Sequence, residues 1–190
     1  DSERTMCTFL GTAGKINDND VNDQQIKNAD ITFLEGYLWD DGEPKKAFDK
    51  AITHSNKVAM SLSDLFCVER HKSHFLDLVK NKLDIIFANE QEILSLTNSV
   101  SFEDVIVFCK QIKKNIIITR GEKGAISING NEIEECKAKV NLAIKDLTGA
   151  GDLFAAGYLH GIINNKSTKE SLEKGTELSA SIIQKIGARI

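Results

Sequence analysis

A short run of small residues is followed by an acidic residue in the last third of the chain. Gly149, Ala150, Gly151 and Asp152 stand between the segment 146–148 and an apolar run with helical spacing. The N-terminus of a helix exposes unpaired N–H groups and the positive end of the helix dipole, and small residues let an anion approach them. A carboxylate beside such an anion site can take a proton from an attacking hydroxyl. This combination is typical of phosphoryl transfer.

The same string also has a purely structural interpretation. An acid in the first turn can simply cap a helix, and four residues of this kind carry little information by themselves. Here, however, they follow strand-like sequence and open a predicted helix over 149–164 whose apolar face would be buried. The carboxylate is therefore expected at the edge of a sheet, where α/β folds bind ligands.

The elements that must position this loop alternate along the chain. Near-continuous apolar runs predict buried strands of a parallel sheet, and segments with apolar residues three or four positions apart predict the helices that connect them. The composition supports a single domain over 1–190 with a sizeable core. The predicted fold is a three-layer α/β/α arrangement with a mainly parallel sheet. Its strands are expected at 5–10, 31–36, 57–63, 83–89 and 115–119, and its crossover helices at 21–29, 43–55, 68–82 and 101–114.

The pattern changes after Thr119. Apolar and polar residues alternate around Asn129-Gly130-Asn131, which predicts a β-hairpin near 124–136. Two helices then follow, over 149–164 and 168–186, and Ser167 or Thr168 is a suitable N-cap for the second.

Composition excludes several classes of function. The 24 Lys and Arg residues face 28 Asp and Glu residues, the net charge is −4, and no basic block is present, so nucleic acid is not an expected partner. No apolar stretch reaches the ~20 residues of a membrane span, and the N-terminus lacks the pattern of a signal peptide. Four scattered cysteines are expected to be buried, reduced thiols. A soluble, cytoplasmic protein is the expectation.

Three further features are weaker candidates for chemistry. The segment 11–15 is similar to a P-loop but has too few residues between its glycines and lacks the final Ser or Thr. His71 and His74 lie one helical turn apart, a spacing compatible with a metal, but charged neighbours favour a solvated helix face. Trp39 follows a predicted strand, where it could contact a ligand, although packing is the commoner role for such a residue.

At this point the sequence resembles a known family. The stretch DLTGAGDLFAAGYL is similar to the C-terminal signature of the PfkB, or ribokinase-like, carbohydrate and nucleoside kinases. The resemblance implies that Asp152 is the catalytic base and that Gly149, Ala150 and Gly151 form the anion hole. It also implies ATP and Mg²⁺ as cofactors.

Two other segments agree with the resemblance in the expected order. FANEQE is similar to the family's N-x-x-E element, which implies that Asn89 and Glu92 act on Mg²⁺ and the nucleotide phosphates, largely through water. ITRGEKGA is similar to a segment that lines the nucleotide site, which implicates Thr119, Gly121 and Gly124. Each has a structural alternative, because Asn89 and Glu92 could merely cap a helix that begins at Glu90 and the second segment could be only a turn into the hairpin.

The resemblance also implies roles for residues near the two ends of the chain. Asp146 and Thr148 fall where many relatives hold a monovalent cation, which makes K⁺ a further candidate cofactor. Arg4 matches a basic position that some relatives place near the transferred phosphate, so it is a candidate substrate-binding residue. The family's upstream sugar-binding and lid motifs are not found. We therefore expect this chain to be the C-terminal, nucleotide-binding part of a longer kinase.

The predicted activity is ATP-dependent phosphorylation of a primary hydroxyl on a nucleoside or sugar. Adenosine is favoured because ERTMCTFLG, ITFLEGYLWD and LSDLFCVER resemble bacterial adenosine-kinase-like sugar kinases. A ribokinase- or fructokinase-type sugar kinase is the alternative within the class. A non-catalytic nucleotide-binding module is the alternative outside it, although such a module would not need a base. The expected partners are ATP and a small nucleoside or sugar, and a homodimer is a further candidate.

Overall fold

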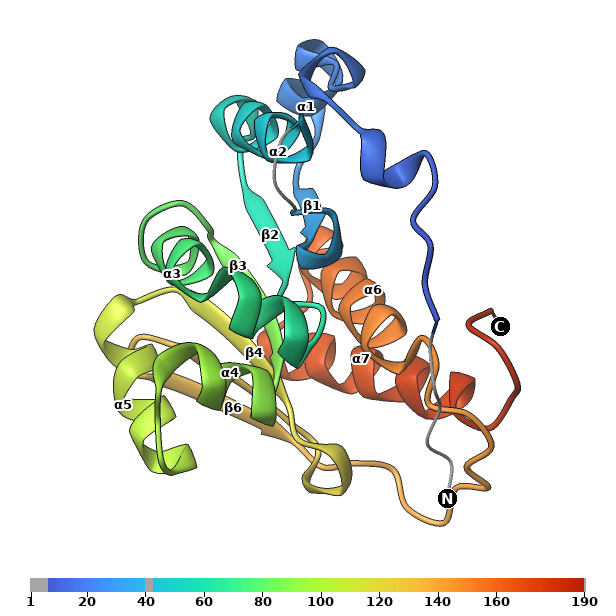
Figure 1. Cartoon of the computed structure of the whole chain (residues 1–190). Coiled ribbons are helices and arrows are strands. Elements are labelled where there is room, and N and C mark those ends of the chain that lie inside the picture. The colour runs from blue at the N-terminus through green and yellow to red at the C-terminus, as the bar shows by residue number, and fades with distance from the viewer. Residues whose placement is uncertain (1–6, 40–42, 190) are drawn as a thin grey trace. The chain divides into compact units, whose positions relative to one another are not determined.

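Strands and helices alternate through most of the chain, and the computed structural model describes residues 7–39 and 43–189 (Figure 1). Within this described part, six strands form one sheet in the order of the sequence. The strands are Thr32–Glu35 (β1), Val58–Ser61 (β2), Ile85–Asn89 (β3), Asn115–Thr119 (β4), Ala125–Asn129 (β5) and Glu132–Cys136 (β6). The α-helices are Asp23–Asn28 (α1), Glu43–His54 (α2), Leu65–Asn81 (α3), Glu90–Thr97 (α4), Phe102–Ile112 (α5), Ala150–Ile163 (α6) and Thr168–Ile182 (α7). Short 3₁₀ turns occur at Ala13–Lys15 (η1), Asp18–Asp20 (η2), Gly36–Leu38 (η3) and Gly121–Lys123 (η4).

The expected α/β fold with a mainly parallel sheet and a β5–β6 hairpin is confirmed. The hairpin turns at Gly130, whose φ of +59° suits a residue without a side chain. One strand prediction is wrong, because residues 7–10, the described part of the segment 5–10, have no regular structure. Phe9 is 94% exposed there. Apolar composition alone does not make a strand where no neighbouring strand supplies ladder hydrogen bonds.

The chain divides into two compact units. The β1–β3 unit comprises residues 8–116 and 128–131, and the α6–α7 unit comprises the described residues of 117–127 and 132–190 together with Cys7. The expected loop at 146–152 belongs to the α6–α7 unit, as do Thr119, Gly121 and Gly124. Asn89 and Glu92 belong to the β1–β3 unit.

Parallel strands form the centre of the β1–β3 unit. Thr32 pairs with Val58 and Ala59 pairs with Ile85, and α2 and α3 supply the crossovers between these strands. Val58, Ala59 and their apolar neighbours in β2 and β3 are buried, which explains why these strands read as continuous apolar runs rather than as alternating ones. The carboxyl ends of β1, β2 and β3 therefore meet at one edge of the sheet.

An aromatic cluster joins the segment after β1 to α3. Trp39 is 2% exposed, and its ring centroid lies 4.8 Å from the ring centroids of both His71 and His74. The expected packing role of Trp39 is confirmed. The expectation of a solvated face is wrong for His71, which is only 7% exposed because it shares the buried face of α3 with Val68 and Phe75. Among the described residues, no three His, Cys, Asp or Glu side chains are grouped as a metal site.

Helices α6 and α7 lie side by side in the α6–α7 unit (Figure 1). Glycines allow this close approach, because a Cβ added at Gly157 would lie 2.8 Å from the Cα of Gly175, and one added at Gly161 would lie 2.4 Å from Oγ of Ser171. Backbones can meet at this distance only where side chains are missing. These glycines therefore allow the backbones of α6 and α7 to pack closely at Gly157 and Gly161.

Two further expectations concern the chain as a whole. No helix in the described ranges is long and apolar enough to cross a membrane. Cys67, Cys109 and Cys136 are buried free thiols as expected, but Cys7 is exposed. Burial raises the pKa of the Cys109 thiol to about 12, so this thiol stays protonated at neutral pH.

Candidate active site

The loop that precedes α6 is shaped by the carboxylate of Asp146. Its Oδ1 accepts hydrogen bonds from the N–H of Thr148 at 2.9 Å and from Oγ1 of Thr148 at 2.6 Å. Its Oδ2 accepts a hydrogen bond from the N–H of Gly187 at 2.9 Å. Gly149 then adopts a φ of +79°, and a Cβ at this position would lie 3.0 Å from Cβ of Ala188. A larger residue at 149 would meet both a conformational and a steric cost.

The first turn of α6 leaves backbone donors available. The N–H of Ala150 donates to the carbonyl of Leu147 at 3.2 Å, and the N–H of Leu153 donates to that of Gly149 at 2.9 Å. Within the described part of the chain, the N–H groups of Gly149, Gly151 and Asp152 have no such acceptor. Amides of this kind at a helix N-terminus favour an anion.

Two side-chain features complete this turn. Asp152 is exposed, so its carboxylate is accessible to a ligand from solvent. A Cβ added at Gly151 would meet no atom within 4 Å, so the space beside this residue is open. The turn therefore combines amide donors, a free approach and a carboxylate that can accept a proton.

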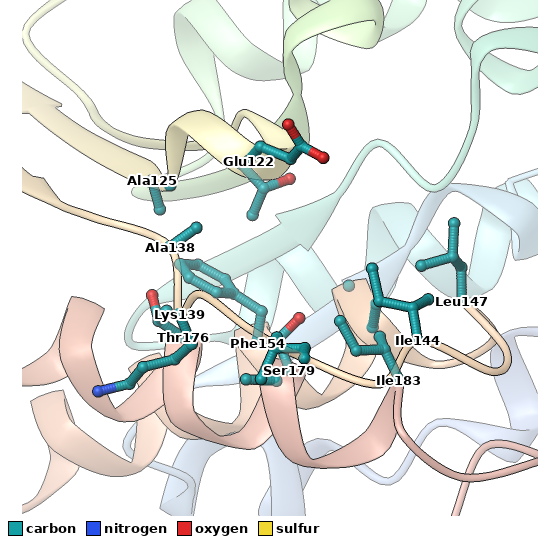
Figure 2. A pocket seen from close by; sticks show the side chains of 17 residues that line it. Glu122, Ala125, Ala138, Lys139, Ile144, Leu147, Phe154, Thr176, Ser179 and Ile183 are labelled. Atoms are coloured by element: carbon teal, nitrogen blue, oxygen red, sulfur yellow. The ribbon is translucent and has the colours of Figure 1, made fainter. Parts of the chain in front are cut away.

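A cavity of about 380 Å³ opens beside this turn within the same unit (Figure 2). Figure 2 shows Glu122 and Ala125 on one side, opposite Phe154 of α6, Ser179 of α7 and Ile183, which directly follows α7. Most lining side chains are apolar, which is the usual character of a small-molecule site of this size. The lining consists of Thr119, Gly121, Glu122, Gly124, Ala125, Ala138, Lys139, Leu142, Ile144, Leu147, Ala150, Gly151, Phe154, Thr176, Ser179, Ala180 and Ile183.

One polar side chain in the lining is left without a partner. Thr176 is 8% exposed, and among the described residues its Oγ1 has no hydrogen-bond partner. A buried hydroxyl without a partner costs about 1–3 kcal/mol, so such groups are rare in folded proteins. A ligand that offers a donor or an acceptor would satisfy this hydroxyl.

The turn after β4 contributes three expected residues to the cavity, Thr119, Gly121 and Gly124. It is held by a hydrogen bond from the N–H of Arg120 to the carbonyl of Gly124 at 2.8 Å. Gly124 has a φ of +92°, and a Cβ there would lie 2.0 Å from the carbonyl oxygen of Cys136. The backbone of β6 therefore requires glycine at this position.

Asn89 and Glu92 form a capping box at the start of α4 in the β1–β3 unit. Oδ1 of Asn89 accepts a hydrogen bond from the N–H of Glu92 at 2.9 Å, and the carboxylate of Glu92 accepts from the N–H of Asn89 at 2.9 Å and from Nδ2 at 2.6 Å. Glu92 is 5% exposed, and burial raises its pKa to about 7, although the N–H of Asn89 opposes this shift. The capping geometry considered from the sequence is thus present, and a role toward Mg²⁺ stays a prediction.

The structure unites some expected residues and leaves others apart. Ala150 and Gly151 line the same cavity as the turn after β4, whereas Gly149, Asp152, Asp146 and Thr148 belong to the adjoining loop and first turn. Arg4 lies outside the described residues. Sequence reasoning did not identify the lining residues Thr176, Ser179 and Ala180 of α7 and Ile183, which directly follows this helix. Their spacing of three, one and three residues marks one helix face, but nothing in it distinguishes a ligand-facing stripe from ordinary core.

The decisive comparison is with families of known proteins. The sequence profile of the "pfkB family carbohydrate kinase" matches residues 1–190. The chain belongs to the pfkB family. The pfkB signature predicted from DLTGAGDLFAAGYL is therefore confirmed at the level of the family.

Solved structures with the pfkB fold resemble the chain closely. An adenosine kinase from Sinorhizobium meliloti has a TM-score of 0.89 and 35% identity, and a probable sugar kinase from Rhizobium etli CFN 42 has a TM-score of 0.87 and 35% identity. Each comparison covers 93% of this chain. A cytidine kinase from Thermococcus kodakarensis is 31% identical over 111 residues, 57% of this chain.

The chain matches only part of these proteins. It covers 56% of the Sinorhizobium structure, 55% of the Rhizobium structure and 40% of the Thermococcus sequence. Family membership and fold are therefore established for this chain.

Proposed function

We propose that the protein transfers the γ-phosphoryl group of ATP to a primary hydroxyl of a nucleoside or sugar. The observation that carries this proposal is the first turn of α6. Amides without acceptors in the described chain, the exposed carboxylate of Asp152 and an apolar cavity adjoin one another within one unit. Phosphoryl transfer requires donors for the phosphate and a base for the acceptor hydroxyl, and this turn supplies both.

The cavity is suited to the base of the nucleotide. Its volume of about 380 Å³ and its apolar lining fit a flat heteroaromatic ring better than a sugar, whose hydroxyls would need many polar partners. The hydroxyl of Thr176 can act as donor or acceptor toward the polar edge of such a ring. The phosphates would then extend toward Gly151, beside which the space is open.

The roles of the loop residues follow from this orientation. The N–H groups of Gly149 and Gly151 would hold the oxygens of the transferred phosphoryl group, with Ala150 keeping the turn closed through its bond to Leu147. Asp152 would accept the proton of the attacking hydroxyl. A positioned base of this type contributes about 10²–10⁴-fold to the rate.

The proposed cofactors are ATP and Mg²⁺. When bound, Mg²⁺ neutralises charge on the phosphates and usually keeps several waters, so it needs only one or two protein carboxylates. The described part of the chain has no cluster of three acidic or metal-ligating side chains, which agrees with such a loosely held ion. We assign Glu92 and Asn89 to contacts with it through water, and Asp146 and Thr148 to a monovalent cation such as K⁺.

Adenosine is the acceptor that we favour. The structure of an adenosine kinase is 35% identical to this chain, but a probable sugar kinase is equally identical and a cytidine kinase is 31% identical, so ribose, fructose and cytidine remain competitors. We further propose a cytoplasmic enzyme that acts without nucleic acid or membrane partners, and its assembly as a homodimer can be tested by sedimentation.

The test uses the full-length protein with ATP, Mg²⁺ and a panel of adenosine, cytidine, ribose and fructose, with ADP release as the readout. Asp152→Asn should lower kcat at least about a hundredfold while leaving the Kd for ATP within a few-fold. Glu173→Gln changes an exposed acid of α7 outside the cavity lining, so it should leave both values unchanged.

Two outcomes would contradict the proposal. If Asp152→Asn turned over at the wild-type rate, Asp152 would not be the base. If the wild-type protein bound ATP but phosphorylated no member of the panel, the chain would instead be a nucleotide-binding module.

A further inference from the structure

The segment that follows α7 packs against the loop that precedes α6. The N–H groups of Lys145 and Asp146 donate to the carbonyl of Ile183, at 2.8 and 3.3 Å. At the other end of the loop, a Cβ on Gly149 would lie 3.0 Å from Cβ of Ala188. The loop is therefore held at both ends by residues 183–188.

The carboxylate of Asp146 connects the two segments between these contacts. Oδ1 fixes the loop internally through the N–H and hydroxyl of Thr148, and Oδ2 accepts the N–H of Gly187 at 2.9 Å. Hydrogen bonds to an ionised acceptor are roughly twice as strong as neutral ones. One side chain thus sets the shape of the loop and also its attachment to the segment 183–188.

We infer that Asp146 and Gly187 form a clasp that positions the phosphate-binding amides at the start of α6. This inference rests on the proposed function, because it assigns the clasp its effect on turnover. The amides of Gly149 and Gly151 lie three and five residues after Asp146, with Ala150 closing the turn between them. A displacement of about 1 Å in such donors can cost about a hundredfold in rate, even without direct contact between the altered residue and the substrate.

Gly187 offers a clean way to disturb the clasp. Its φ is +87°, a conformation that side chains disfavour, yet a Cβ there would meet no atom within 4 Å. Gly187→Ala therefore strains the backbone that presents the N–H to Asp146 and causes no collision. Gly130 is a matched control, because its φ is +59° and the nearest atom to an added Cβ is Cγ of Lys113 at 3.9 Å.

The experiment compares Asp146→Asn, Gly187→Ala, their combination and Gly130→Ala in the full-length protein. Asparagine at position 146 keeps one acceptor oxygen, but its side-chain NH₂ group replaces the other. This group would face a donor of Thr148 or Gly187, so the hydrogen bond to that donor is lost. Each single clasp variant should lower kcat about 10- to 100-fold and change KM for ATP less than about threefold. Because both act on one bond, the double variant should fall no more than about threefold below Asp146→Asn. Gly130→Ala should keep the wild-type kcat.

Hydrogen exchange provides a readout that does not depend on turnover. The hydrogen-bonded amides of Lys145, Thr148 and Ala150 should exchange faster in both clasp variants, while amides in the middle of α7 should not change. Asp146→Asn changes the acceptor of the clasp hydrogen bond and Gly187→Ala changes the residue that donates it. Either variant can therefore test the clasp if the other folds poorly. Activity is measured over a range of KCl concentrations, because a role of Asp146 solely as a cation ligand would shift the KCl dependence in Asp146→Asn alone.

Several results would overturn the clasp. The clasp is refuted if the losses of kcat add in the double variant, or if Gly187→Ala keeps the wild-type kcat and amide exchange rates. It is also refuted if Gly130→Ala loses as much kcat as Gly187→Ala, or if KCl fully restores the kcat of Asp146→Asn. Failure of the proposed function looks different. The wild-type protein would then phosphorylate nothing, while the exchange of the Lys145, Thr148 and Ala150 amides would still report whether the clasp exists.

Discussion

The contact between α6 and α7 gives a prediction whose size can be worked from distances. In Gly157→Ala, the new Cβ would lie 2.8 Å from the Cα and N of Gly175 and 2.8 Å from the carbonyl oxygen of Lys174. Ordinary van der Waals contact begins at about 3.4 Å, so the helix backbones must separate by at least roughly 0.6 Å. All three neighbours are backbone atoms, so no side chain can rotate away to make room.

Two opposing energies decide the sign of the effect. Replacing glycine by alanine in a helix interior gains about 1 kcal/mol of intrinsic helix stability. Overpacking of a tight contact costs typically about 1–3 kcal/mol and sometimes more, and here the rigid neighbours place the cost at or above the upper end. We expect a net loss of about 2 kcal/mol, which lowers Tm by roughly 4–8 °C for a chain of this size.

The assay is urea and thermal unfolding of the full-length protein followed by circular dichroism. Gly151→Ala serves as the control, because it makes the same substitution in the same helix where an added Cβ would meet nothing within 4 Å. Its stability should equal or exceed that of the wild type. If Gly157→Ala were as stable as Gly151→Ala, the glycines would not be what allows the helices to approach.

Three further predictions concern other parts of the chain. Burial raises the pKa of Glu92 to about 7, above its usual 4.5, so the folded state keeps a proton that the unfolded state loses. The free energy of unfolding should therefore fall by at most about 3 kcal/mol as pH rises from 4.5 to 7. Glu92→Gln should flatten this pH dependence in urea unfolding, and an unchanged dependence would show that Glu92 does not cause it. Gly124→Ala places a Cβ 2.0 Å from the carbonyl oxygen of Cys136 and should cost at least about 4 kcal/mol, seen as loss of folded protein on expression. Iodoacetamide should modify Cys7 and spare Cys109 in the folded protein, because the thiol of Cys7 is exposed and burial raises the pKa of the Cys109 thiol to about 12. Mass spectrometry of the labelled peptides can show this difference.

The sequence predicted the sheet and the loop before α6 because both depend on local patterns. The strands β2, β3 and β4 are continuous apolar runs, and the Asn129-Gly130-Asn131 turn has few alternatives to a hairpin. The glycines at 149 and 151 mark a helix start that has no side-chain cap. Such features are determined by neighbours in the sequence, so they can be read without the fold.

The remaining features depend on contacts between distant residues. The unpaired hydroxyl of Thr176 and the bond between Asp146 and Gly187 arise only when α7 packs beside α6. His71 is buried on the face of α3 that also carries Val68 and Phe75, whereas the charged residues beside it in the sequence favoured a solvated face. The segment 7–10 has the apolar composition of a strand, but composition cannot supply a neighbouring strand to pair with.

The register of the parallel strands also bears on how the protein is made. Thr32 pairs with Val58 and Ala59 pairs with Ile85, so partners in both pairs stand 26 positions apart. No strand of this group can find its neighbour on the ribosome until a whole connecting helix has been synthesised, and contacts of such separation form slowly. Nascent chains that pause between β2 and β3 would expose an unpaired apolar edge, and such an edge is prone to aggregate with other chains.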